Sequence, residues 1–127
     1  MRRVLLCLVS PFALFACSKS IDPAYLKAHQ ERADGICACV KAQPKLPTKT
    51  VDGAEIYDLE PAKKILQATS DCIHKFPGES AIATPNGDPP GIYEESLKES
   101  DRKQLEAENE RATACKDVHL KEWRAVF

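Results

Sequence analysis

The sequence predicts an all-α fold: a small three-helix bundle, or a four-helix bundle if the last helical segment is broken, cross-linked by two disulfides and carrying one long loop. Three observations predict it. Apolar residues recur at the three- and four-residue spacing of a helix face over three segments, and proline or glycine ends the first two. Outside a short apolar leader, four cysteines remain, and an even number of cysteines in a small domain indicates disulfides.

The first helix is expected to begin at Pro23. Asp22 before it is a good N-cap residue, and proline is favoured at the first helical position. Pro44 ends the helix, because proline cannot continue it. Gly35 costs this helix about 1 kcal/mol relative to alanine, so we expect a neighbouring backbone to approach closely there. The apolar face consists of Tyr25, Leu26, His29, Ala33, Ile36, Cys37 and Val40.

Two cysteines lie on opposite sides of this apolar face. Cys37 and Cys39 are about 200° apart around the helix. A bond between them would span one residue, which is poor geometry within a helix. Each is therefore expected to pair with Cys72 or Cys115, and two arrangements stay open: Cys37–Cys72 with Cys39–Cys115, or Cys39–Cys72 with Cys37–Cys115. In both arrangements the first helix is central and is joined to a helix on either side.

The second helix is expected to begin near Asp58 or Glu60 and to end at Pro77-Gly78. Its apolar pattern is the cleanest in the chain, and Cys72 lies on the inner face, as a bond to the first helix requires. The face consists of Ala62, Ile65, Leu66, Thr69, Cys72, Ile73 and Phe76.

The segments on either side of the second helix carry turn signals. Residues 48–57 contain Asp52-Gly53, which is typical of a hairpin turn, but their apolar residues alternate poorly, so a small hairpin is an alternative to a loop there. Residues 78–91 hold three prolines and three glycines and are expected to form the long surface loop.

After this loop the chain predicts one long helix, or two helices joined near Ser100-Asp101. Nine of the 14 residues from 98 to 111 are charged, so we expect this segment to extend past the core as a solvated arm. We expect Trp123 and Phe127 in the core, because large aromatic side chains are mostly buried, and the alternative is an exposed anchor for a partner. The apolar stripe consists of Tyr93, Leu97, Leu105, Ala112, Cys115, His119, Trp123 and Val126.

The first 16 residues have the pattern of a leader. Arg2 and Arg3 precede 13 mostly apolar residues, 4–16. As a helix this run would span about 20 Å, less than the ~30 Å hydrocarbon core of a membrane. A positive start, an apolar middle and a small-residue exit are typical of a removable secretory signal peptide. The end of the leader, Leu14-Phe15-Ala16-Cys17, resembles the lipobox of bacterial lipoproteins.

This resemblance implies that the sulfur of Cys17 receives a diacylglycerol, that residues 1–16 are removed and that the new amino group is acylated. Each buried methylene contributes about 0.8 kcal/mol, so two or three acyl chains hold a protein at a membrane almost permanently. Ser18, in place of an aspartate, points to the outer membrane. Residues 17–21 are then a short lipidated tether, and residues 22–127 form a single helical domain. The alternative is a secreted protein with Cys17 as a spare thiol.

Charge argues against one class of partner. Without the leader, 111 of the 127 residues remain, and the loss of Arg2 and Arg3 leaves 16 basic residues against 19 acidic ones, a formal charge of −3. Nucleic-acid binding needs a clustered basic surface. We therefore expect no nucleic-acid partner.

The chain contains candidate metal ligands but no complete motif. Zinc sites usually space paired cysteines two to four residues apart, and Cys-Ala-Cys is tighter than that. Haem attachment needs Cys-x-x-Cys-His, which the sequence lacks, and it also lacks the common hydrolase and phosphate-binding motifs. We expect no catalytic residues, no metal and no cofactor. The candidate ligands are Cys37, Cys39, Cys72, Cys115, His29 and His119.

Taken together, these features predict a lipid-anchored protein on the periplasmic face of the bacterial outer membrane. It would be a non-catalytic protein-binding or assembly module of the cell envelope, bound to the bilayer through acylated Cys17 and to an unidentified envelope protein. The expected contact surfaces are the charged segment 98–111, residues 123–127 and the loop 78–91. Two alternatives stay open: an inhibitor or immunity-type lipoprotein that neutralises a periplasmic enzyme or toxin, and a metal or haem carrier.

Overall fold

Residues 18–127 are described by the computed structural model, and within them three long helices form a bundle with a short helix and a two-stranded hairpin. The elements are α1 Pro23–Lys41, β1 Thr48–Val51, β2 Ala54–Tyr57, α2 Leu59–His74, the single 3₁₀ turn η1 Glu79–Ala81, α3 Pro90–Glu95 and α4 Glu99–Val126. The predicted bundle of helices is confirmed. The expectation of an all-α fold is wrong at the hairpin.

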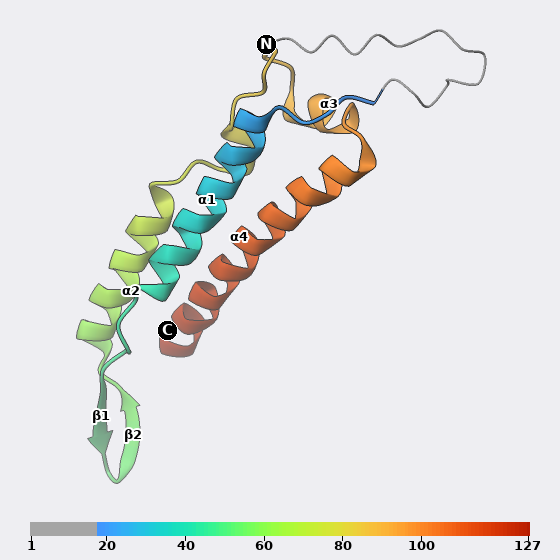
Figure 1. Ribbon diagram of the computed structural model, residues 1–127. Coiled ribbons are helices and arrows are strands. Elements are labelled where there is room, and N and C mark those ends of the chain that lie inside the picture. Colours follow the sequence, from blue (N-terminus) through green and yellow to red (C-terminus); the bar gives the residue numbers. More distant parts are fainter. Residues whose placement is uncertain (1–17) are drawn as a thin grey trace, which may run out of the picture.

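The bundle is elongated (Figure 1). Each of α1, α2 and α4 packs against the other two. The 28 residues of α4, at a rise of ~1.5 Å each, make this helix about 42 Å long. α3 and the beginning of the described chain lie at one end of the bundle, and the hairpin projects from the other end (Figure 1).

The start of α1 agrees with its sequence. Asp22 has an extended backbone, and its carboxylate accepts hydrogen bonds from the main-chain nitrogens of Ala24, at 2.8 Å, and Tyr25, at 3.2 Å. Pro23 occupies the first helical position, where its missing N–H costs nothing. The predicted cap therefore fixes where α1 begins.

The hairpin is set by its turn. Asp52 and Gly53 have φ angles of 51° and 79°, and two central residues with positive φ form the tight turn that matches the twist of paired strands. Val51 pairs with Ala54 on either side of the turn. All eight strand residues are exposed. Because neither face is covered, no apolar alternation is needed, and the weak alternation in the sequence did not exclude a hairpin.

The core follows the long axis of the bundle in three clusters. The first lies beside α3, the second around the disulfides and the third beneath the base of the hairpin. Their buried members are Tyr25, Ile82, Tyr93, Leu97 and Leu105 in the first, Ala33, Ile36, Cys39, Ile73 and Ala112 in the second, and Leu46, Ala62 and Leu66 in the third.

Gly35 has a close neighbour, but it is a side chain and not the backbone that was expected. A Cβ atom added there would lie 2.1 Å from Cζ of Phe76, a side chain packed against the second cluster. The neighbour is an aromatic ring that follows α2, and it uses the space that a side chain on Gly35 would occupy.

The segment 98–111 is not a solvated arm, which corrects the prediction. Leu105 and Ala112 are buried, and the guanidinium of Arg111 lies 2.7 Å from a carboxylate oxygen of Asp34 on α1. Leu105 and Ala112 lie two turns apart on one face of α4 and are buried in the core, and Arg111 adds an ion pair to α1, while the other charged side chains of the segment stay partly or fully exposed.

Two further features differ from the sequence-based expectation, the start of α4 and the attachment of the surface loop. The last helical segment breaks at Ser96 to Lys98, and α4 starts at Glu99, ahead of the expected junction near Ser100-Asp101. The loop 78–91 is anchored by Ile82, which is buried in the first cluster.

Candidate functional site

The four cysteines of the described chain form two disulfides. Cys37 on α1 pairs with Cys115 on α4, with their Cα atoms 5.2 Å apart, and Cys39 on α1 pairs with Cys72 on α2, with their Cα atoms 5.8 Å apart. This is one of the two arrangements that the sequence left open. Because the two bonds leave α1 in different directions, α1 is covalently joined to both of its neighbours, as predicted.

The disulfides bear on the metal or haem carrier. Within residues 18–127 no cysteine is free, so no thiolate is available as a ligand. His29 is fully buried, and its Nδ1 lies 2.9 Å from Oδ1 of Asn109. His119 is buried against the ring of Trp123. No group of three or more His, Cys, Asp or Glu side chains suited to a metal occurs in this part of the chain.

The chain after Cys17 is attached to the corner between α3 and α4. The main-chain nitrogen of Lys19 donates to the carbonyl of Ser96 at 2.8 Å, and the nitrogen of Lys98 donates to the carbonyl of Lys19 at 2.9 Å. The next residues continue the attachment. The nitrogen of Ile21 donates to a carboxylate oxygen of Asp101 at 2.8 Å. The predicted tether is thus fixed to the body from Lys19 onward.

Buried tyrosines strengthen the same corner. The nitrogen of Asp22 donates to the hydroxyl of Tyr93 at 2.9 Å, and the hydroxyl of Tyr25 donates to Glu94 at 3.1 Å. Burial, together with the negative charge of Glu94, raises the pKa of Tyr25, and burial raises the pKa of Tyr93. Both hydroxyls therefore keep their protons, and the Tyr25 hydroxyl remains a donor that links α1 to α3.

Cys17 and the leader lie outside the described residues, so signal-peptide removal and lipidation stay predictions. Within residues 18–127, none of the helices has the combination of length and apolar character that crossing a bilayer requires.

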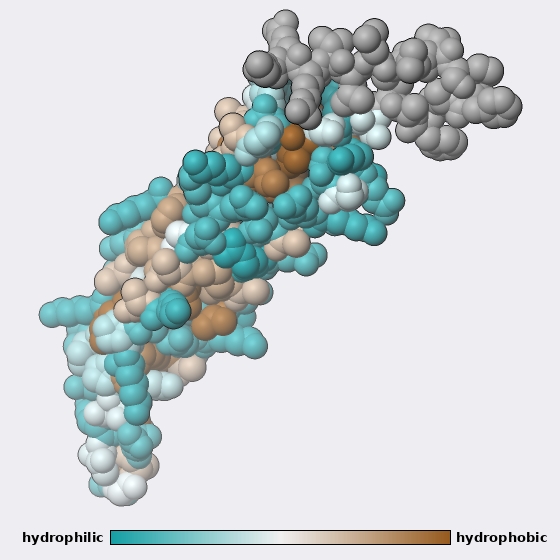
Figure 2. All heavy atoms as spheres, viewed as in Figure 1, coloured by the Kyte–Doolittle hydropathy of each residue, from teal (hydrophilic) through white to brown (hydrophobic). Residues whose placement is uncertain are grey.

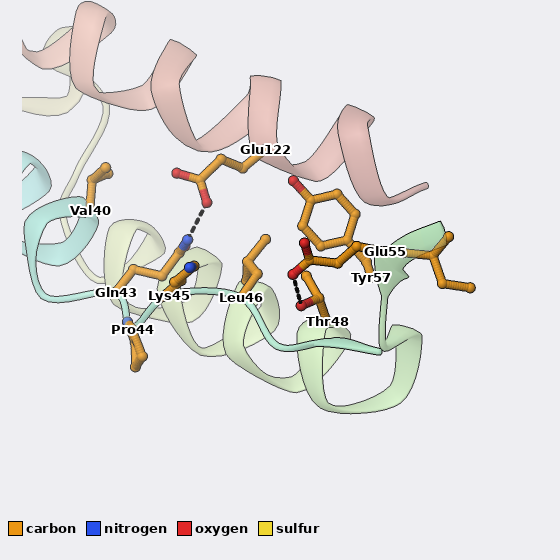
Figure 3. Close-up of a pocket in the computed structure, with 10 residues that line it drawn as sticks. Val40, Gln43, Pro44, Lys45, Leu46, Thr48, Glu55, Tyr57 and Glu122 are labelled. Carbon is orange, nitrogen blue, oxygen red and sulfur yellow. Dashed lines mark hydrogen bonds between the residues drawn. The ribbon is translucent and has the colours of Figure 1, made fainter. Parts of the chain in front are cut away.

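An open cleft of about 660 Å³ lies between the hairpin, the segment after α1 and the end of α4, and we call it the hairpin cleft. Figure 3 shows Gln43 and Glu122 pointing toward each other across it, with Nε2 of Gln43 2.5 Å from Oε2 of Glu122. Tyr57 and Leu46 supply apolar surface (Figure 3). The lining residues are Val40, Gln43, Pro44, Lys45, Leu46, Thr48, Glu55, Ile56, Tyr57 and Glu122.

A smaller depression, which we call the hairpin groove, also lies at the base of the hairpin and shares Ile56 and Tyr57 with the cleft. It measures about 290 Å³ and is lined by Lys49, Ile56, Tyr57, Leu59 and Val126. Ile56 and Leu59 are 44% and 51% exposed, which is high for large apolar side chains. Figure 2 shows hydrophobic surface at this end of the bundle. The groove is therefore apolar and open to solvent.

The charged groups of the hairpin cleft differ in their partners. The Glu55 carboxylate accepts a hydrogen bond from the hydroxyl of Thr48 at 2.6 Å, and Glu122 is held by Gln43. Lys45 of the cleft and Lys49 of the neighbouring hairpin groove take part in no ion pair with the rest of residues 18–127. The carboxylates are thus engaged, and the two ammonium groups are available to an incoming anion.

An aromatic series leads from the core to this end of the molecule. The ring centroid of Trp123 lies 6.1 Å from that of His119 and 5.2 Å from that of Phe127. Trp123 is half-buried against the third core cluster, whereas Phe127 is 57% exposed, so the core location expected for both rings is correct only for Trp123. Burial lowers the pKa of His119.

Sequence reasoning did not find the hairpin cleft. Its residues come from three separate stretches of chain, and none of them forms a motif. The available signal was Asp52-Gly53, which is typical of a hairpin turn, followed by the large side chains of Ile56 and Tyr57.

Comparison of the chain with protein-family models, with curated proteins and with solved structures found no match.

Proposed function

We propose that this protein is a lipoprotein of the bacterial outer membrane that faces the periplasm and binds a protein partner at its hairpin end without catalysing a reaction. The observation that carries the proposal is the apolar hairpin groove beside the open hairpin cleft, at the end of the bundle opposite the first described residue.

The membrane location is supported by the leader. Residues 14–17 resemble a lipobox, and the chain that follows is attached to the body within two residues of Cys17. An anchor at that point would leave the hairpin end uncovered and directed away from the lipid.

The binding role is supported by exposed apolar side chains that occur together. Single exposed apolar residues are ordinary on a protein surface, whereas a contiguous group marks an interaction site. Ile56, Tyr57 and Leu59 line one groove, and all three are more than one-third exposed. With Lys45 and Lys49 unpaired beside them, the surface suits a polypeptide that brings apolar side chains and carboxylates.

The hairpin also offers main-chain groups. Within residues 18–127 its sheet has two strands only, so each strand has one edge without a paired strand. Extended peptides commonly bind by adding a strand to such an edge, with main-chain hydrogen bonds giving affinity and side-chain pockets giving specificity. An extended segment of an envelope protein that lies along the hairpin and places a side chain in the hairpin groove fits these features.

Site-specific photo-cross-linking in intact cells tests the binding role. A photoreactive amino acid at Ile56 is expected to give a discrete adduct, which Leu59→Asp should abolish. The same amino acid at Lys27, a residue of α1 with a 74% exposed side chain, is the matched control and should give none. Equal adducts at both positions, or none at Ile56, would contradict the proposal. A single small adduct would favour an inhibitor of one enzyme, and several large adducts would favour an assembly module.

Membrane fractionation tests the anchor separately. Cys17→Ala should move the protein from the membrane fraction to the soluble fraction, because the acyl chains supply the membrane affinity. Unchanged sedimentation of the variant would contradict the lipoprotein assignment.

A further inference from the structure

The end of the bundle at α3 carries the most exposed of the large apolar side chains in residues 18–127. Ile92 on α3 is 61% exposed. Its neighbour Tyr93 is 5% exposed and holds the main-chain nitrogen of Asp22. α3 is therefore fixed to the body by Tyr93 and presents Ile92 to the surroundings.

The proposed anchor would emerge beside Ile92. The nitrogen of Ser96 donates to the carbonyl of Ile92 at 3.3 Å, and the carbonyl of Ser96 accepts from Lys19. Ile92 is thus one helical turn from the residue that holds the tether. A lipid on Cys17 would start no more than about 8 Å from Lys19, because two residues of chain reach no farther.

We propose that α3, with Ile92 at its surface, lies on the bilayer that carries the anchor and is a second, apolar contact with the lipid. α4 then runs away from the membrane, and the hairpin is presented at the far end of the bundle (Figure 1). This inference rests on the lipidation proposed for Cys17.

The contact is apolar, not electrostatic. Between residues 79 and 103 six acidic side chains outnumber three basic ones, so this end of the molecule has no net attraction for anionic lipids. Attachment at Lys19 also removes the flexible linker that would let the body tumble. An isoleucine held this close to an anchor meets the lipid at high effective concentration, so one apolar side chain is enough to orient the body on the membrane.

Quenching of a fluorophore by lipid measures the orientation. The lipidated chain, purified and placed in phosphatidylcholine vesicles, would carry the environment-sensitive dye NBD on Ile92→Cys. In a matched protein the dye would be on Val51→Cys, an exposed apolar position of the hairpin. Both substitutions replace exposed side chains, so neither disturbs the core. Vesicle sedimentation, measured on the same samples, reports the anchor itself.

The expected result is a blue-shifted emission and strong quenching by nitroxide-labelled lipid at position 92, unchanged at high salt, with neither effect at position 51. Absence of quenching at both positions in protein that sediments would show a body detached from the lipid and overturn the inference, while leaving the proposed anchor intact. Quenching at both positions would show a body lying flat and would also overturn it. Loss of quenching at high salt would overturn the apolar contact. Protein that does not sediment would overturn the inference together with the proposed function.

Discussion

Gly35→Ala tests the packing of α1 against the end of α2. The added methyl group would stand 2.1 Å from Cζ, 2.2 Å from Cε1 and 2.9 Å from Cε2 of Phe76. Carbon atoms in contact prefer separations of about 3.5–4.0 Å. The ring must therefore leave its place against the second core cluster, and α1 cannot relieve the overlap because two disulfides hold it to its neighbours.

Two opposing effects set the size of the change. Truncation of a buried phenylalanine to alanine costs about 3–5 kcal/mol, and because Phe76 is half-buried we take about half of that for its displacement, or roughly 2 kcal/mol. Alanine is favoured over glycine inside a helix by about 1 kcal/mol. Gly35→Ala should therefore lower the free energy of unfolding by about 1 kcal/mol. In a Phe76→Ala background the overlap is absent, and Gly35→Ala should raise the free energy of unfolding by about 1 kcal/mol.

Urea unfolding of the four proteins of this cycle, followed by the fluorescence of Trp123, measures the effect. The chain would lack its leader and carry Cys17→Ser. The sign of the Gly35→Ala effect is expected to reverse between the two backgrounds, with a coupling of roughly 2 kcal/mol. A stabilising effect of Gly35→Ala in both backgrounds would refute the contact between the glycine and the ring.

Three further predictions follow from the covalent frame, a buried histidine and the cap of α1. Cys37→Ser with Cys115→Ser removes the disulfide that spans 78 residues and should lower the free energy of unfolding by up to about 4.5 kcal/mol in the chain-entropy model. Removal of Cys39–Cys72, which spans 33 residues, should cost less, roughly 3.7 kcal/mol. Urea midpoints in the reverse order would contradict this. Burial holds the pKa of His119 below its unfolded value near 6.5, so its contribution to stability is complete above that pH and is lost as the pH falls through the lowered pKa. His119→Gln should therefore reduce the loss of unfolding free energy between pH 7.5 and pH 5.5. An identical pH profile of the variant and the parent protein would speak against this. Asp22→Ala should lower the unfolding free energy by about 1 kcal/mol in the same urea assay, whereas Asp22→Ser, which keeps a capping oxygen, should cost much less; equal losses would exclude capping as the cause.

The helices and the disulfide frame were predictable because their determinants are local. The Asp22 cap and its proline act within one turn of helix, and the apolar spacing of α2 is uninterrupted. The opposite directions of Cys37 and Cys39 follow from helical geometry alone, so the central place of α1 could be inferred before any contact was known. The choice between the two pairings could not, because it depends on which neighbour lies on which side of α1.

The remaining features depend on contacts between distant segments. The charge of residues 98–111 suggested a solvated arm, yet Leu105 and Ala112 are buried and Arg111 pairs with Asp34 on α1. Poor alternation in the sequence argues against the hairpin, but strands that are exposed on both faces have no reason to alternate. The hairpin cleft joins residues as far apart as Gln43 and Glu122, a proximity that only the packed bundle creates.

The anchor and the cross-linked bundle both depend on the state of the cysteines, and the intact mass of the protein extracted from bacterial membranes measures that state most directly. The predicted species begins at Cys17, carries the mass of its acyl chains, lacks two hydrogens for each of two disulfides, and takes up iodoacetamide only after reduction. A chain without acyl mass that is alkylated at Cys37, Cys39, Cys72 and Cys115 before reduction would contradict both the anchor and the cross-linked bundle.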